Sequence, residues 1–137
     1  MQQEQITIAS LDQLQEFAIA FSSKLMLGMT LGLSGPLGAG KTTLASALIK
    51  ALGCNQPVTS PSFVLEQRYP IPGGEIAHWD LYRLTALPQE LLLPSRNILR
   101  IVEWSERFAE IRTELNLELI IKPDATYSKR VITVIRY

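Results

Sequence analysis

The sequence lacks the features that mark secreted, membrane-spanning or strongly nucleic-acid-binding proteins. One cysteine, Cys54, occurs in 137 residues, so no intrachain disulfide can form, which fits a reducing compartment. The 13 basic and 13 acidic residues cancel, which leaves no overall positive field for nucleic acid or an anionic membrane. The first ten residues show no secretory-signal pattern, and the longest apolar stretch, 25–33, is too short to cross a bilayer. We therefore expect a cytoplasmic protein with no membrane contact and no strong direct binding to nucleic acid.

Enough apolar material is present for a core, because 47% of the residues are hydrophobic. The length predicts a single domain, 1–137. The apolar patterning predicts strands at 5–9, 29–34 and 97–104, hairpins pairing 63–69 with 75–84 and 117–123 with 130–137, helices at 11–25, 40–52 and 105–115, and one helical turn within 87–94. This mixture predicts an α/β fold: a three-layer sandwich around a mostly parallel central sheet with antiparallel hairpin additions.

Two of the predicted helices have a serine at the start. Ser10, with Gln13 three residues later, forms a capping-box pattern before the helix at 11–25. Ser105 is the corresponding candidate cap for the helix at 105–115. The apolar face predicted for the first helix consists of Leu11, Leu14, Phe17, Ala18, Phe21 and Leu25.

A glycine-rich stretch follows the predicted buried strand at 29–34. Gly35, Gly40, Lys41 and Thr42 fit the pattern G-x-x-x-x-G-K-[ST], placed between a strand and a helix. Glycines let successive backbone N–H groups curl around a phosphate, and the following helix directs free N–H groups and a positive dipole end at it. The lysine can reach the β- and γ-phosphates, and the threonine hydroxyl can bind Mg²⁺. The alternative, a glycine-rich turn without a ligand, is much less favoured in this context, so the pattern predicts nucleotide binding on a P-loop NTPase-like fold.

Two acidic residues lie at the ends of predicted strands. Asp80 ends one of them, and Glu103 follows four mostly apolar residues as a Walker B acid does. In open α/β sheets, ligands bind at the carboxyl ends of the strands. Hydrolysis needs an acid near the metal and a group that orients water, so at least one of these carboxylates is expected to act there. The spacing leaves open which of the two positions the water.

Several neighbouring residues have both a functional and a structural interpretation. The loop containing Thr59, Ser60, Pro61 and Ser62 is either a switch ordered by the γ-phosphate or a proline-rich connector. His78, on a predicted strand, is more often a structural residue than a base. Trp79 and Trp104 each adjoin one of the acids, and both can be explained by packing.

The motifs GPLGAGKTTL, VTSPSF, HWDLYRL and VEWSER occur in this order across most of the chain. Together they resemble the TsaE family, the bacterial P-loop ATPases required for threonylcarbamoyladenosine in tRNA. The glycine-rich motif is generic, whereas the other three are much more specific. The resemblance implies that Thr42 and Glu103 hold Mg²⁺, that Asp80 is needed for turnover, and that 59–62 form the switch loop. It further implies that the following residues surround ATP, with Ser10 near the nucleotide: Gly38, Ala39, Gly40, Lys41, Thr42 and Thr43.

The resemblance also implies partners. Members of the family act with TsaB and TsaD, so this chain is expected to hydrolyse ATP slowly alone, to act on homologues of those proteins, and to meet tRNA only through them. Two other classes of function remain possible from the residues. A small-molecule P-loop kinase needs an acceptor pocket and a lid, for which this chain has little room. A nucleotide-dependent binding module without hydrolysis would need Lys41 but neither Asp80 nor Glu103.

Overall fold

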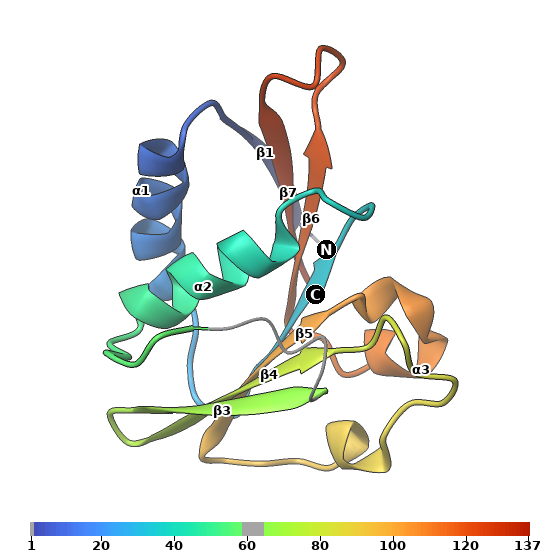
Figure 1. Cartoon of the computed structure of the whole chain (residues 1–137). Coiled ribbons are helices and arrows are strands. Elements are labelled where there is room, and N and C mark those ends of the chain that lie inside the picture. Colours follow the sequence, from blue (N-terminus) through green and yellow to red (C-terminus); the bar gives the residue numbers. More distant parts are fainter. Residues whose placement is uncertain (1, 59–64) are drawn as a thin grey trace.

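The computed structural model describes residues 2–58 and 65–137, and these residues build one seven-stranded sheet. The strands run in the order β1-β7-β6-β2-β5-β4-β3 across the sheet (Figure 1). Their bounds are β1 Gln2–Ile8, β2 Thr30–Ser34, β3 Glu66–Ile71, β4 Gly74–Asp80, β5 Ile98–Glu103, β6 Leu117–Pro123 and β7 Arg130–Arg136. The helices are α1 Leu11–Ser22, α2 Lys41–Ala51 and α3 Ala109–Arg112, with single-turn 3₁₀ helices η2 Gln89–Leu92 and η3 Ser105–Arg107.

The centre of the sheet is parallel and its two sides are antiparallel. Strand β2 pairs in parallel with β5 and β6, and β4 pairs in parallel with β5. The hairpin β6–β7 extended by β1 flanks this centre on one side, and β3 pairs antiparallel with β4 on the other. Since β2, β4, β5 and β6 point the same way, their carboxyl ends meet at one edge, where ligands bind in sheets of this kind.

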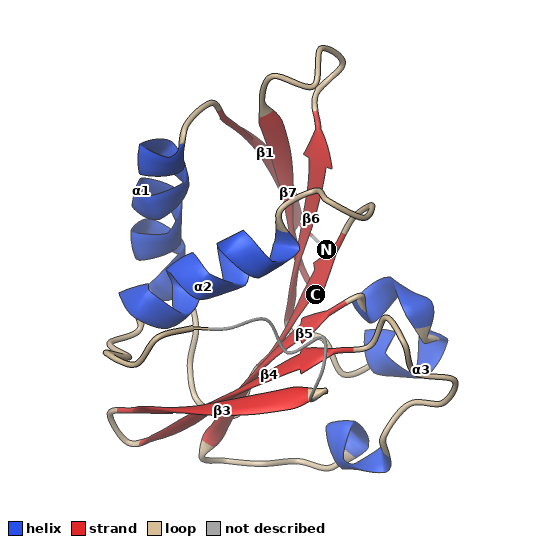
Figure 2. Cartoon of the chain, in the orientation of Figure 1, coloured by secondary structure: helices blue, strands red, loops and turns tan. Residues whose placement is uncertain are grey.

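The two faces of the sheet are covered unequally (Figure 2). Helices α1 and α2 lie on one face and enclose the larger core, to which the sheet contributes alternate residues such as Leu31, Leu33 and Ile101. The short helices lie on the other face over a smaller core that contains Trp79 and Val102. These three layers follow from the alternation of strand side chains, which sends neighbouring residues to opposite faces.

Helix α1 begins at Leu11, as the capping pattern predicts. The Ser10 hydroxyl accepts a hydrogen bond from the Gln13 amide at 3.1 Å, and the Gln13 side chain accepts one from the Ala9 amide at 2.7 Å. The helix ends at Ser22, three residues earlier than predicted, because the Ser22 and Ser23 hydroxyls bond back to carbonyl groups of the last turn. The predicted apolar face is wrong at its first position, since Leu11 is 60% exposed.

Both predicted hairpins are present, but the loop of the first is shorter than expected. Strands β3 and β4 pair through Ile71 and Gly74, so only two residues, Pro72 and Gly73, connect them. Pro70 lies within β3 and can be accommodated there because β3 is the edge of the sheet, where a missing N–H is tolerated. The first strand is also longer than predicted, because all seven residues of β1 pair with β7.

The helix predicted at 105–115 is replaced by two short pieces, η3 and α3. Trp104 has φ +62°, and Phe108, between the two pieces, has extended backbone angles that interrupt the helix. Ser105 does not cap a helix as predicted. Its side chain is fully buried, and its hydroxyl has no hydrogen-bond partner within the described part of the chain.

Gly32 allows η3 to pack directly against β2, and we predict that alanine at this position destabilises the protein. A Cβ atom on Gly32 would lie 2.6 Å from the Ser105 hydroxyl and 3.0 Å from a Leu115 methyl group. Overpacking of this kind lowers the free energy of unfolding by about 1–3 kcal/mol. Urea unfolding of Gly32→Ala, Ser105→Ala and the double variant measures the loss.

Ser105→Ala alone should be nearly neutral, because it removes a buried hydroxyl without a partner among the described residues. In the double variant it should restore part of the stability, since the nearest obstacle is gone. If the changes in the free energy of unfolding of the two single variants simply added up in the double variant, the Ser105 hydroxyl would not be the atom that clashes with a Cβ at position 32.

Candidate functional site

The loop between β2 and α2 has a backbone that strongly favours glycine at key positions. Gly35, Gly38 and Gly40 have φ values of +141°, +77° and +108°. At Gly35 an added Cβ would overlap the carbonyl oxygen of Ile121 on β6, so the loop lies directly against that strand. Gly40 caps α2 without any side-chain hydrogen bond, which leaves the first N–H groups of this helix directed into the loop. The loop and helix thus present backbone donors and a positive dipole end to a ligand.

Lys41 is held inside this loop. Its ammonium group donates to the Gly35 and Pro36 carbonyl oxygens at 2.6 and 2.9 Å and lies 3.9 Å from the centre of the Trp104 ring. The residue is only 5% exposed. Burial lowers the pKa of Lys41 below its ordinary value of 10.5, and the nearby carboxylates of Glu106, Glu103 and Asp80 oppose that shift only in part.

The two candidate acids lie side by side at the carboxyl edge of the sheet. Asp80 ends β4 and Glu103 ends β5, and the parallel register pairs these two residues directly. Glu103 is also opposite Leu33, one residue before the end of β2. The Asp80 carboxylate accepts a hydrogen bond from the Tyr82 amide at 2.9 Å. The sheet therefore brings both acids to the start of the glycine-rich loop.

Glu103 bonds to side chains from two other elements. One carboxylate oxygen accepts a hydrogen bond from the Thr42 hydroxyl at 2.9 Å, and the other lies 2.6 Å from Nε2 of His78. His78 and Glu103 are almost fully buried. Sequence reasoning favoured a structural role for His78, and its contact with the acid was missed. The available signal is strand alternation, which places His78 on the same face of β4 as Asp80.

The two tryptophans separate into different environments. Trp104 lies in the site, with its ring 4.7 Å from that of Tyr82 and beneath the Lys41 ammonium group. Trp79 lies in the core on the opposite face of the sheet, as the packing interpretation expects. A hollow of about 330 Å³ opens between the loop and these acids, and its lining includes Leu37, Gly38, Gly40, Lys41, Thr42, Thr43, Asp80, Tyr82, Glu103 and Trp104.

Ser10 lies at a second hollow, of about 260 Å³, on the other side of the loop. This hollow is lined by Ser10 together with Ala39, Gly40 and Thr43 of the loop region, and by residues at the end of the β6–β7 hairpin. One of these, Arg130, donates through Nε to the Ala39 carbonyl oxygen at 3.0 Å. The sequence carried no signal for Arg130, because 91 residues separate it from Ala39 along the chain.

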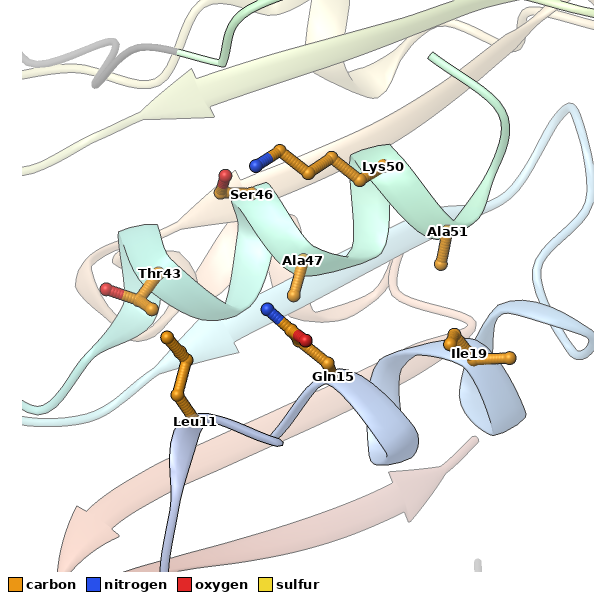
Figure 3. Close-up of a pocket in the computed structure, with 8 residues that line it drawn as sticks. All are labelled: Leu11, Gln15, Ile19, Thr43, Ser46, Ala47, Lys50 and Ala51. Atoms are coloured by element: carbon orange, nitrogen blue, oxygen red, sulfur yellow. The ribbon is translucent and has the colours of Figure 1, made fainter. Parts of the chain in front are cut away.

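A larger groove, of about 520 Å³, runs between α1 and α2 (Figure 3). In this view Gln15 reaches from α1 toward Ala47 on α2. Among the described residues that line it, Lys50 alone is ionisable, whereas the smaller hollow at the glycine-rich loop contains Lys41, Asp80 and Glu103. Size therefore does not identify the site, and the chemistry lies in the smaller hollow.

The predicted switch residues cannot be placed relative to this site, because Thr59, Ser60, Pro61 and Ser62 lie outside the described residues.

Within 2–58 and 65–137, no helix combines the length and the apolar character that crossing a membrane requires.

Comparison with known proteins identifies the family. The model of a family described as "Threonylcarbamoyl adenosine biosynthesis protein TsaE" matches residues 8–132. The chain belongs to the TsaE family. The predicted resemblance is thereby confirmed, and with it the α/β fold of P-loop NTPase type.

Similar TsaE proteins come from several bacteria. A protein of Nostoc sp. described as "tRNA threonylcarbamoyladenosine biosynthesis protein TsaE" is 35% identical over 116 residues, which cover 77% of this chain and 70% of that protein. A protein of Rickettsia bellii with the same description is 35% identical over 131 residues, covering 88% and 90%. The crystal structure of Bacillus subtilis YdiB superposes with a TM-score of 0.76 over 98% of this chain and 86% of that one, and its 24% identity supports the fold alone.

The buried lysine of this TsaE protein should leave a signature in its stability. Burial lowers the folded-state pKa of Lys41, so the charged lysine destabilises the fold at neutral pH. This penalty disappears as the pH rises through the lowered pKa toward 10.5. Relative to Lys41→Met, the wild-type free energy of unfolding should therefore increase across that window. Urea unfolding of both proteins, free of metal and nucleotide, measures the difference, and a difference that does not change with pH would contradict the prediction.

Proposed function

We propose that this chain is a Mg²⁺-dependent ATPase that serves threonylcarbamoyladenosine modification of tRNA. The observation that carries the proposal is the hydrogen bond between Thr42 and Glu103, made beside Lys41 and directly next to Asp80. A P-loop hydroxyl bonded to a carboxylate at the end of a neighbouring strand is what a nucleotide–metal site needs. Family membership favours ATP use in tRNA modification over any other role for such a site.

The phosphate-binding part of the proposal rests on the loop backbone. We propose that the N–H groups from Gly38 to Thr43 surround the phosphates and that Lys41 leaves its loop carbonyls to bind the β- and γ-phosphates. The exchange is favourable because the carbonyl oxygens carry only partial charges, whereas phosphate oxygens carry full ones. The hollow beside Ser10 and Arg130 adjoins the same loop, so we propose that it receives the nucleoside.

Thr42 and Glu103 fit a magnesium ion by their chemistry. A hydroxyl and a carboxylate are hard oxygen ligands, and 2.9 Å separates the Thr42 and Glu103 oxygens. Over the described ranges no three His, Cys, Asp or Glu side chains form a metal-binding group. Mg²⁺ in NTPases commonly has few protein ligands and completes its shell with phosphate oxygens and water. Bound there, the ion would neutralise the charge that develops on the transferred phosphoryl group.

Asp80 is the residue that we propose to orient the attacking water. Its carboxylate is held by the Tyr82 amide at the mouth of the hollow, adjacent to Glu103. A carboxylate can accept several hydrogen bonds at once, so the contact with Tyr82 does not by itself prevent Asp80 from binding a water. In this assignment Glu103 acts toward the metal and Asp80 toward the water.

Replacing Asp80 by alanine should abolish hydrolysis and preserve binding. Loss of a water-orienting carboxylate is expected to lower kcat about 10²–10⁴-fold, with the Kd for ATP nearly unchanged. Lys41→Ala should instead weaken ATP binding, because a cation at the phosphates is lost. Titration with a fluorescent ATP analogue and single-turnover hydrolysis separate the two effects. Glu75→Ala, at the opposite end of β4, is the control and should behave as wild type.

Normal turnover by Asp80→Ala would remove Asp80 from the mechanism. If wild-type protein bound ATP without hydrolysing it under any condition, the chain would be a nucleotide-dependent binding module. Transfer of the γ-phosphate to a small acceptor would make it a kinase.

The proposed partners are homologues of TsaB and TsaD, with tRNA reached through them and with the cytoplasm as the location. We propose that the whole chain acts as one P-loop ATPase domain in that system. Purified chain should hydrolyse ATP slowly alone and faster when the TsaB and TsaD homologues of the same host and tRNA are added. The stimulation should be absent in Asp80→Ala. Turnover that ignores the partners would contradict this assignment and leave the ATPase proposal intact.

A further inference from the structure

The fully buried His78 contacts Glu103, and the function proposed above assigns no role to this contact. Nε2 of His78 lies 2.6 Å from one carboxylate oxygen of Glu103, and both side chains are shielded from solvent, at 0% and 3% exposed. We infer that His78 is a positioning residue, which holds the Glu103 carboxylate in the orientation that lets it act together with Thr42. The inference rests on the proposed function, because Glu103 needs a fixed orientation only if it serves a metal–nucleotide site.

The geometry shows why two contacts are needed. A carboxylate on the flexible glutamate side chain can rotate about its last bond, and one hydrogen bond does not stop this rotation. Glu103 has a donor on each oxygen: the Thr42 hydroxyl on one and the His78 imidazole on the other. The two donors come from α2 and β4, and Glu103 itself comes from β5. Side chains from α2 and β4 thus hold the carboxylate, which β5 carries, and they fix its plane in the absence of a ligand.

The contact also fixes the state of the imidazole. A carboxylate accepts hydrogen bonds and does not donate them, so Nε2 of His78 carries the proton. Nδ1 of the same ring is buried and has no hydrogen-bond partner among the described residues. An aliphatic side chain would fill this position without burying an unpartnered nitrogen. The bond to Glu103 is therefore what histidine contributes at this position and an aliphatic side chain would not.

The register between β4 and β5 explains why the His78 side chain can contact Glu103. His78 lies two residues before Asp80 on the same face of β4, and its pairing partner on β5 is Ile101, two residues before Glu103. The imidazole therefore lies on the same face of the sheet as the Glu103 carboxylate, two residues before the carboxyl end of β4, and contacts the carboxylate from there. Carboxylate ligands of metal sites generally need such supporting hydrogen bonds, and their loss lowers metal affinity or activity about 10–100-fold.

The test compares amides that differ by one methylene. His78→Gln can place an amide N–H near the position of Nε2, whereas His78→Asn is too short to reach Glu103. His78→Phe keeps the ring and removes the donor. His78→Asn and His78→Phe should lower kcat about 10–100-fold and should raise the Mg²⁺ concentration needed for half-maximal binding of a fluorescent ATP analogue. In EDTA the same analogue should bind all variants equally. His78→Gln should recover most of the loss.

Two controls separate positioning from packing. Trp79→Phe alters a buried aromatic residue one position along the same strand, on the opposite face, and should keep wild-type kinetics. Thermal unfolding should show that the glutamine and asparagine variants, which are matched in polarity, melt at similar temperatures. Equal losses in His78→Gln and His78→Asn, or normal Mg²⁺ dependence in a folded His78→Asn, would overturn the inference.

A measurement without nucleotide or metal separates this inference from the proposed function. Nitrogen-15 NMR of the wild-type imidazole should show a proton on Nε2, with this hydrogen-bonded proton shifted downfield. Glu103→Gln should move that resonance. A ring that carries its proton at Nδ1 and none at Nε2 would overturn the positioning role even in an active ATPase. A wild-type chain that shows this NMR signature but neither binds nor hydrolyses ATP would instead overturn the proposed function.

Discussion

The parallel pairing of β2, β5 and β4 is the constraint on which the rest of this site depends. It brings the ends of three strands to one edge of the sheet, so the glycine-rich loop after β2 begins beside Glu103 and Asp80. A parallel strand pair forces the chain to cross back over the sheet, as the segment that contains η2 does between β4 and β5. Helix α2 follows β2 and has its N-terminus at the loop. The antiparallel strands at either side extend the sheet without altering this edge. A slip of one residue between β4 and β5 would send Asp80 or Glu103 to the opposite face.

The site concentrates groups that a fold alone would avoid. A lysine, a histidine and a glutamate are buried close together in space, and Trp104 has a positive φ that non-glycine residues rarely adopt. Such groups destabilise a protein unless they are paired, and here Lys41 is only partly compensated, since its pKa remains lowered. Natural proteins commonly accept lower stability at places where function needs a prearranged environment. Burial of apolar side chains in the two cores, one on each face of the sheet, offsets the destabilisation that these buried polar groups cause.

The contacts at the loop form a continuous set that includes aromatic as well as charged groups. Lys41 touches the Trp104 ring, Trp104 packs on Tyr82, and the Tyr82 amide holds Asp80. In a second series of contacts, Thr42 hydrogen-bonds to Glu103, and Glu103 contacts His78. The two series begin at Lys41 and Thr42, which are adjacent residues of α2. A ligand that draws Lys41 or Thr42 toward its phosphates would therefore change the surroundings of both acids.

The sequence by itself determined the features that depend on neighbouring residues. Glycines at fixed offsets before a lysine specify the loop, the Ser10–Gln13 pattern starts α1, and apolar alternation locates the strands, because these signals act over a few residues. Local signals failed at two places: at the helix expected after Ser105, which the extended backbone of Phe108 divides, and at the first position of the apolar face of α1, where Leu11 is exposed.

Only the tertiary structure decided which side chains meet. Thr42 bonds Glu103 across 61 residues of chain, and Arg130 bonds Ala39 across 91. His78 and Glu103 are 25 residues apart, and their contact exists because two parallel strands lie in one particular register. The physical reason is that hydrogen bonds act over about 3 Å in space, whereas sequence patterns report only what lies nearby along the chain.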